Sequence, residues 1–409
     1  MDSSTIINNV ARFENKEGYP QGVYYAVHSD KEFVQFILGA DQEFSIRTNL
    51  PENLVNTQIE GSKENQLFLE SRIYDLNYEA KVKPLNDIIK AGLKNSAEYQ
   101  DALKKLQIEV DARDTFLEKI FREHPDLFFT KFKKAGQNPK FRDELPDEEQ
   151  VIVYRREYWD SVDFSDTRLL YTSVIDNKLN NYFGQLTTHK PDSIIASADY
   201  LLNKTFDYPL FYKYIANWIA LKYEPTKTNL MDSEAIFVHM VQNYFTYDRA
   251  FWSDSASVYS LQLRAKEMSN SLIGQKGPNV SAKDPDGNIK SIYDLTSDYI
   301  VVYMFNPTCE HCMVETPKLV SLYNQQKEHL FDVYSIAIET QDEEWKNYLI
   351  KNKVPFTSVF DPTNQAIYAT YYVDITPEIY ILNKERIIIA KNIKVDQIME
   401  AIRLDQNKK

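Results

Sequence analysis

The chain has 409 residues, of which 43% are hydrophobic and 26% are charged. This is a globular composition, and a chain of this length usually divides into about two or three domains. The formal net charge of −13 argues against a nucleic-acid partner, because phosphate contacts require a basic face. The sequence predicts no membrane span, and its first residues lack the basic and apolar regions of a signal peptide.

Residues 1–62 predict a small antiparallel β-rich domain. Three apolar runs, at 22–27, 33–38 and 43–48, are rich in aromatic and β-branched residues and are separated by turn residues. Ser62 then occupies a position typical of a helix N-cap. The chain is therefore expected to change from strands to helices at this point.

Residues 63–270 predict a mostly α-helical accessory domain, because apolar side chains recur at three- and four-residue spacing. The histidines and carboxylates of this region show no metal-ligand spacing, so we expect them to be packed or solvated side chains. Breaks between helices are predicted at prolines and glycines, namely at Pro84, His124-Pro125, 136–139, Pro191, Pro209 and Pro225.

Residues 271–409 alternate between strand and helix patterns. The order predicts an α/β domain in which a mixed sheet is covered by helices and ends in a β-hairpin. The predicted strands are 299–305, 331–338, 378–382 and 386–390, and the predicted helices are 310–326, 343–353 and 395–404.

The chain has only two cysteines, Cys309 and Cys312, and both lie at the junction between strand 299–305 and the helix that follows. A helix N-terminus presents unpaired backbone N–H groups and a positive dipole end, which stabilise a thiolate. The same C-x-x-C spacing occurs in zinc sites, but here only the adjacent His311 accompanies the two thiols. We therefore predict a redox-active dithiol with no metal and no separate cofactor.

The C-terminal part of the chain contains a set of short motifs at recognisable positions: Leu272-Ile273-Gly274 with Pro278, Cys309-Glu310-His311-Cys312, Glu315, Pro317, Trp345 and Thr376-Pro377. In these residues the chain resembles the thioredoxin superfamily, and within it the TlpA-like and ResA-like thiol-disulfide oxidoreductases of the bacterial envelope. This resemblance implies a thioredoxin-like fold for residues 271–409. The region before it resembles the accessory half of large envelope thioredoxin-like proteins.

Two positions depart from thioredoxin itself. Thr308 precedes the first cysteine, and Tyr303 stands where thioredoxin has a buried acid. A general cytosolic thioredoxin is therefore a poor match. The envelope branch instead carries an acid three positions after the second cysteine, and this chain has Glu315 there.

The resemblance implies a role for each cysteine and for this acid. Cys309, the more exposed thiol, attacks a substrate disulfide as the thiolate, and Cys312 resolves the mixed disulfide. Glu315 lies one helical turn beyond Cys312, where it can take or return the proton of that thiol. The alternative for Glu315 is a solvated helix carboxylate.

Two further residues are predicted to act on the dithiol. Pro377 resembles the cis-proline that faces the dithiol in this superfamily and holds the preceding backbone extended for a substrate strand; the alternative is an ordinary trans proline. His311, if protonated, stabilises the Cys309 thiolate, whereas Glu310 opposes it.

The leading prediction is a thiol-disulfide oxidoreductase that acts on protein disulfides in the periplasm or cell envelope of a bacterium, as a reductant rather than a general oxidant. It requires protein substrates with disulfides or thiols and a membrane or soluble thiol electron donor. Membrane attachment is expected only through a lipoprotein anchor that has been removed.

Two alternatives stay open. One is a thiol peroxidase, although Val302 and Asn306 stand where peroxiredoxins place Pro and Thr, respectively, before the reactive cysteine. The other is an envelope module in which residues 1–270 bind a partner and the thioredoxin fold serves only as part of the docking surface.

Overall fold

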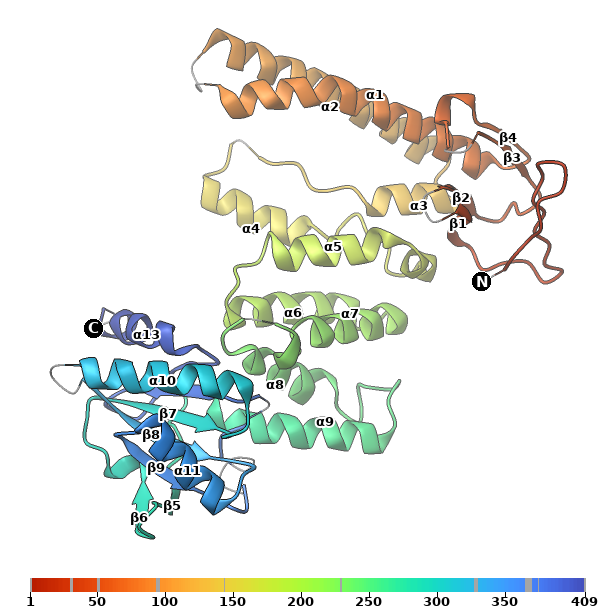
Figure 1. The fold of residues 1–409 in the computed structure, drawn as a ribbon. Coiled ribbons are helices and arrows are strands. Elements are labelled where there is room, and N and C mark those ends of the chain that lie inside the picture. The colour runs from red at the N-terminus through yellow and green to blue at the C-terminus, as the bar shows by residue number, and fades with distance from the viewer. Residues whose placement is uncertain are drawn as a thin grey trace. The chain divides into compact units, whose positions relative to one another are not determined.

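The computed structural model describes residues 2–29, 32–49, 52–92, 96–142, 144–228, 230–326, 330–364, 370–373 and 375–407. The chain divides into two compact units, Met1–Leu186 and Thr187–Lys409 (Figure 1). The predicted boundaries after residues 62 and 270 both lie where the secondary structure changes, inside these units. The division into three domains stays a prediction. Within the described residues, no helix has the length and apolar character needed to cross a bilayer.

The first unit begins with two separate antiparallel strand pairs. β1 (Gly22–Ser29) pairs with β2 (Glu32–Leu38), and β3 (Ser45–Arg47) pairs with β4 (Gln58–Glu60). The antiparallel pairing is confirmed, but the three predicted strands do not form one sheet. The third predicted strand, β3, pairs instead with β4. β4 has only three residues, too few to show an alternating pattern in the sequence.

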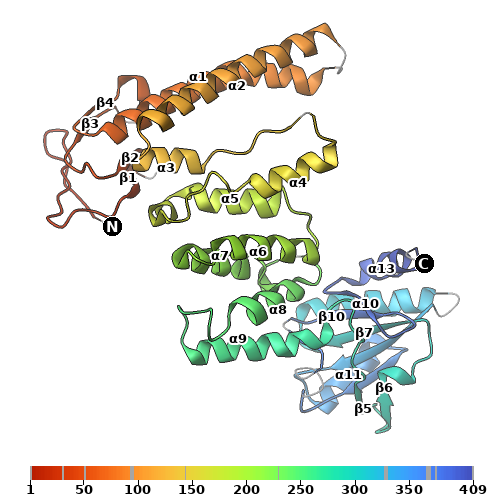
Figure 2. The ribbon, with the colours of Figure 1, turned by 180° about the vertical axis from the view of Figure 1, so that it is seen from behind.

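The first long helix of this unit begins where the sequence predicts. The Ser62 side chain accepts a hydrogen bond from the backbone N–H of Asn65 at 3.3 Å, which caps α1. The break predicted at Pro84 is wrong, because this proline lies inside α1. Figures 1 and 2 show α1 and α2 side by side, and packing of this kind offsets the lost backbone hydrogen bond. The helices are η1 (Leu54–Asn56), α1 (Lys63–Ala91), α2 (Ala97–Glu123), α3 (Phe128–Ala135), α4 (Asp147–Glu157), η2 (Thr167–Tyr171) and α5 (Ser173–Gly184).

The second unit opens with further helices. Pro191 and Pro209 stand at the starts of α6 and α7, where a missing N–H costs nothing, so the breaks predicted there are confirmed. The helices are α6 (Pro191–Thr205), α7 (Pro209–Lys222), η3 (Pro225–Lys227), α8 (Ser233–Tyr244), α9 (Ser255–Met268) and η4 (Ser269–Ser271).

A mixed sheet follows, with the strand order β11-β10-β7-β8-β9-β5-β6 among the described residues. β7, β8 and β9 are parallel, and β10 runs antiparallel to β7 and β11. The predicted thioredoxin-like sheet is therefore confirmed, although the short β5, β6 and β9 were not predicted. The strands are β5 (Ser281–Lys283), β6 (Ile289–Ser291), β7 (Tyr299–Phe305), β8 (Phe331–Ala337), β9 (Thr357–Phe360), β10 (Glu378–Leu382) and β11 (Ile388–Lys391).

Side chains alternate between the two faces of β7. Val301 and Tyr303 pack against residues of α10 (Glu310–Gln325), α11 (Asp342–Asn352) and α13 (Ile398–Gln406), which cover one face. On the other face, Ile300 and Val302 pack against the segment that contains η5 (Ile292–Asp294). Trp345, one of the residues that carry the resemblance, is buried on the helix-covered face. A further short helix, η6 (Val395–Gln397), precedes α13.

Candidate active site

The dithiol follows the carboxyl end of β7, which lies between the parallel strand β8 and the antiparallel strand β10. Between strand and helix, the Asn306 side chain forms a tight turn: its Oδ1 accepts hydrogen bonds from the backbone N–H (2.8 Å) and the hydroxyl (2.7 Å) of Thr308. Its Nδ2 donates to the carbonyl of Glu339 at 3.1 Å. An Asn-Pro pair after a strand is a turn signal, and Asn306 thereby fixes where Cys309 begins α10.

Cys309 is the N-cap of α10, and its Sγ accepts a hydrogen bond from the backbone N–H of Cys312 at 3.3 Å. Both cysteines are free thiols; Cys309 is partly exposed, whereas Cys312 is fully buried in the core beneath the helices. The predicted difference in exposure is confirmed. Only Cys309 can therefore meet a macromolecular substrate.

The pKa values of the two thiols differ in direction. Burial acts to raise the pKa of Cys309, but hydrogen bonds from the Thr376 side chain, from Cys312 and from the backbone of His311 outweigh it, and the net pKa is lowered. Burial, together with the hydrogen bond to Cys309, raises the pKa of Cys312 to about 12. Cys309 therefore ionises first and supplies the thiolate.

The difference between the pKa values of the two thiols predicts how the alkylation of each depends on pH. We expect the rate at which iodoacetamide modifies Cys309 to reach half its maximum below pH 9.0, the ordinary pKa of the thiol, while Cys312 stays unmodified. Mass spectrometry of each cysteine after short exposures at a series of pH values measures this. A small unstructured cysteine peptide is the control, and a Cys309 midpoint at or above that of the peptide contradicts the assignment.

The segment before β10 brings a proline to the dithiol. The Thr376–Pro377 peptide bond is cis, so the predicted cis-proline is confirmed. The Cys309 thiol donates to the backbone carbonyl of Thr376 at 3.1 Å, a contact that favours the protonated thiol and is lost when the thiol ionises. The pairing of β10 with β7 joins two parts of the site that are far apart in sequence.

Glu315 lies on α10 one turn beyond Cys312, with its side chain 11% exposed. Its Oε1 accepts from the Lys318 ammonium at 2.6 Å and its Oε2 from the backbone N–H of Val395 at 2.9 Å. Burial acts to raise the pKa of Glu315, but these bonds outweigh it and lower the pKa. Glu315 is thus a buried, paired carboxylate rather than a solvated one, and its role toward Cys312 stays a prediction.

The side chains of His311 and Glu310 are exposed on the first turn of α10. It is the backbone of His311 that bonds to Cys309 and lowers its pKa. The influence of the imidazole ring on the thiolate stays a prediction.

A chain of buried hydroxyl groups beneath Cys312 was not predicted. The Tyr348 hydroxyl donates to the carbonyl of Cys312 at 3.0 Å and lies 2.8 Å from the Thr316 hydroxyl, which lies 2.7 Å from the Tyr303 hydroxyl. Burial raises the pKa of Tyr303, and it raises that of Tyr348 to about 12, so both phenols stay neutral. These neutral groups lie where the sequence comparison with thioredoxin places a buried acid. In the sequence, only Tyr303 indicated this difference.

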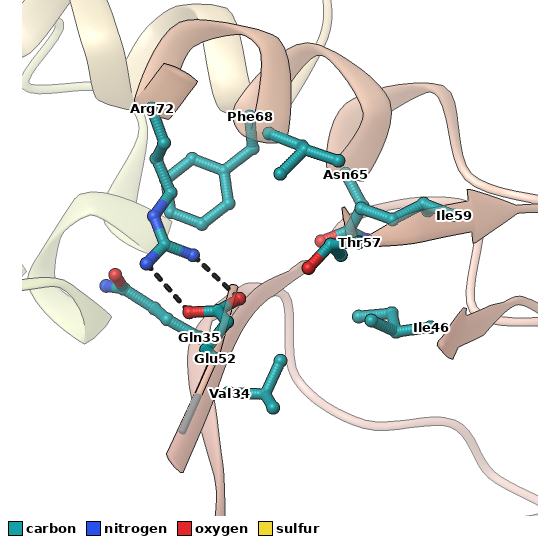
Figure 3. A pocket seen from close by; sticks show the side chains of 10 residues that line it. Val34, Gln35, Ile46, Glu52, Thr57, Ile59, Asn65, Phe68 and Arg72 are labelled. Atoms are coloured by element: carbon teal, nitrogen blue, oxygen red, sulfur yellow. Dashed lines mark hydrogen bonds and ion pairs between the residues drawn. The ribbon is translucent and has the colours of Figure 1, made fainter. Parts of the chain in front are cut away.

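A pocket in the first unit contains a charged pair rather than a free charge. The Arg72 guanidinium donates to both carboxylate oxygens of Glu52, at 3.0 and 2.8 Å (Figure 3). Each charge is thus already neutralised by the other, so this pocket has no charged group set aside for a ligand. The other residues that line it are Val34, Gln35, Ile46, Thr57, Ile59, Asn65, Phe68 and Leu69. Across the described ranges, no group of three or more His, Cys, Asp or Glu side chains gathers as a metal site.

Residues 273–391 match the AhpC/TSA family. The fold is similar to that of a thioredoxin-like protein from Bacteroides caccae, with a TM-score of 0.55 and 18% identity over 66% of this chain and 99% of that one. A domain of a possible thiol-disulfide isomerase from Cytophaga hutchinsonii is 30% identical over 34% of this chain and 97% of that one, with a TM-score of 0.32. No curated protein matches the chain.

The sheet order, the dithiol at the start of α10 and the family match define the C-terminal part as a thioredoxin-superfamily domain. The finer resemblance, to the TlpA-like and ResA-like branch, stays a prediction from the sequence.

Proposed function

We propose that the protein is a thiol-disulfide oxidoreductase that acts on protein disulfides through Cys309 and Cys312. The observation that carries the proposal is the pair of unequal thiols: a partly exposed Cys309 with a lowered pKa at the start of α10, above a buried Cys312. A thiolate that is both accessible and stabilised is the nucleophile that thiol-disulfide exchange requires.

The reaction takes place in two exchange steps. The Cys309 thiolate attacks one sulfur of the substrate disulfide, a mixed disulfide forms, and the other substrate sulfur leaves as a thiolate. Cys312, once deprotonated, attacks the Cys309 sulfur and releases the second substrate thiol. The substrate gains two electrons, and the protein is left with a Cys309–Cys312 disulfide.

Three side chains are proposed to assist these steps. Glu315 takes the proton of Cys312, and its position one helical turn away supports this. Its carboxylate is paired with Lys318 and Val395, so one of these two hydrogen bonds must loosen before the proton is transferred. Pro377 holds the Thr376 carbonyl beside Cys309, where an extended substrate strand can pair with the backbone. His311, when protonated, adds a positive charge near the thiolate.

The proposed setting is the periplasm or cell envelope of a bacterium, with disulfide-containing proteins as substrates. A thiol electron donor, in the membrane or in solution, reduces the Cys309–Cys312 disulfide after each cycle. The direction proposed is reduction, which the acid at Glu315 supports, because a carboxylate near the dithiol opposes thiolate formation.

The reduction potential tests the direction. We expect equilibration with glutathione buffers to give a value nearer the roughly −270 mV of thioredoxin than the roughly −120 mV of a strong oxidant such as DsbA. The purified protein should also reduce the disulfides of a model protein when a dithiol regenerates it. A potential close to that of DsbA overturns the proposed reductant role.

The two alternatives make different demands. A peroxidase needs groups that activate a peroxide beside the cysteine, but Val302 is buried in β7 and the Asn306 side chain is engaged in its turn. Peroxide consumption far above that of a free thiol is the result that would favour it. The partner-binding alternative is separated from the enzyme by the trapping experiment described in the Discussion.

A further inference from the structure

A buried group of charges lies where α8 meets the sheet, within the second unit. The Lys391 side chain, at the end of β11, is 0% exposed, and its Nζ is 3.3 Å from Glu234 Oε1 and 4.0 Å from Asp232 Oδ1. It also donates to the carbonyl of Ser271 at 3.2 Å. Both carboxylates stand at the start of α8 and are nearly fully buried. Such groups are costly to bury unless their geometry is held, so this cluster fixes α8 to the end of β11.

From this cluster a chain of hydrogen bonds leads to the cis-proline. Asn392 donates from its side chain to Glu234 Oε1 at 2.8 Å, and from its backbone to Glu378 Oε1 at 3.2 Å. Glu378 is buried and directly follows Pro377. Two hydrogen bonds therefore connect Glu234 of α8 to the residue next to the cis bond. Figure 2 shows the ribbon of α8 beside that of β10.

The segment before the proline also forms hydrogen bonds with residues of this helical region. Arg264 of α9 donates to the Tyr372 hydroxyl at 3.0 Å. The backbone of Tyr372 donates to the Ser271 hydroxyl at 3.3 Å and accepts from the Tyr380 hydroxyl at 2.9 Å. Helix α9 thus contacts the chain before Thr376–Pro377, and α8 is connected through Asn392 to the residue after it.

We propose that Glu234 is a positioning residue for the dithiol, which it reaches through Asn392 and Glu378. By fixing Glu378, it holds Thr376 against the Cys309 thiol, and so it sets how readily that thiol ionises. Glu234 and Glu378 are buried at the two ends of this chain of hydrogen bonds, and Asn392, which is itself exposed, joins them. Hydrogen bonds to buried groups are held firmly in place, so a change at α8 is transmitted to Thr376. This inference rests on the proposed dithiol chemistry, and it gives the helices before residue 271 a part in the active site.

Two variants break the network at different points. Glu234→Ala removes the acceptor for Asn392, whereas Glu234→Gln keeps an oxygen at that place. Asn392→Gly removes the donor but leaves Lys391 its partner, and glycine tolerates the positive φ of 55° at this position. Glu267→Ala, on α9 and outside the network, is the matched control.

The hydrogen bond from the Thr376 side chain lowers the pKa of Cys309 and outweighs the carbonyl contact. We therefore expect Glu234→Ala and Asn392→Gly, which loosen Thr376, to raise the pH midpoint of Cys309 alkylation by roughly one unit and to change the equilibrium constant with glutathione roughly tenfold. Glu234→Gln should keep the alkylation midpoint and the equilibrium constant close to those of the wild type, and Glu267→Ala should change neither. A merely structural role lowers the melting temperature without moving the midpoint.

A wild-type midpoint in folded Asn392→Gly protein overturns the inference. The alkylation midpoint requires no substrate, so it also separates this inference from the proposed function. A shifted midpoint in a protein that reduces no disulfide sustains the positioning role and contradicts only the proposed reaction.

Discussion

Replacing Cys309 by serine should lower the rate of disulfide reduction by about three orders of magnitude or more, the size of loss seen when a nucleophile is removed. The serine hydroxyl does not ionise near neutral pH, so the first exchange step has no thiolate. Replacing Cys312 instead leaves that step intact, because the exposed thiol at the N-cap of α10 remains. The Cys312→Ser protein should therefore accumulate a mixed disulfide that it cannot resolve.

Non-reducing gels of the envelope fraction of cells that express each variant measure the outcome. Cys312→Ser should give higher-mass bands that a reductant removes, Cys309→Ser should give few, and the double variant should give none. Covalent partners identified by mass spectrometry name the substrates. If neither single variant traps a partner while residues 1–270 still bind one, the protein is a binding module and the enzyme proposal fails.

The parts of the site that were predictable from sequence are those determined locally. The run 299–305 shows its strand character in continuous apolar residues, and the amphipathic pattern that begins at the C-x-x-C pair, after three intervening residues, predicts a helix start there. The contact between Cys309 and the Thr376 carbonyl joins residues 67 positions apart. Only the family resemblance indicated it, because no periodicity connects the two segments.

What was not predictable depends on contacts between elements. Glu234 was expected to be a packed or solvated side chain, but it is buried, and its hydrogen-bond partner Asn392 is 158 positions away. His239, on the same helix, pairs with Asp199 at 2.6 Å, a partner that its spacing in the sequence did not indicate. Pro84 was taken for a helix break, although its helix continues through it. In each case tertiary packing decides what local spacing leaves open.

The buried cluster of Lys391, Asp232 and Glu234 gives the largest expected effect on stability. Lys391→Ala should lower the free energy of unfolding by about 3–5 kcal/mol at alkaline pH, because it leaves Asp232 and Glu234 buried without their cation. The melting temperature should fall by roughly 10 °C. Lys384→Ala is the control: that lysine pairs with Asp298 at 3.6 Å with both side chains more than 60% exposed, so its loss should leave the melting temperature almost unchanged.

The pH dependence of this loss has a definite sign. Burial raises the pKa of Asp232 from 3.8 to about 7, while Lys391 acts to lower it. Because the folded pKa is the higher one, the stability that Asp232 contributes is fully present below pH 3.8 and is lost as the pH rises through about 7. Without Lys391 the ionised carboxylate is less favourable still, so the variant loses more over that interval. The difference in melting temperature between wild type and Lys391→Ala should therefore be larger at about pH 8.5 than at about pH 6, and an equal or reversed difference would show that Lys391 does not compensate the charge on Asp232.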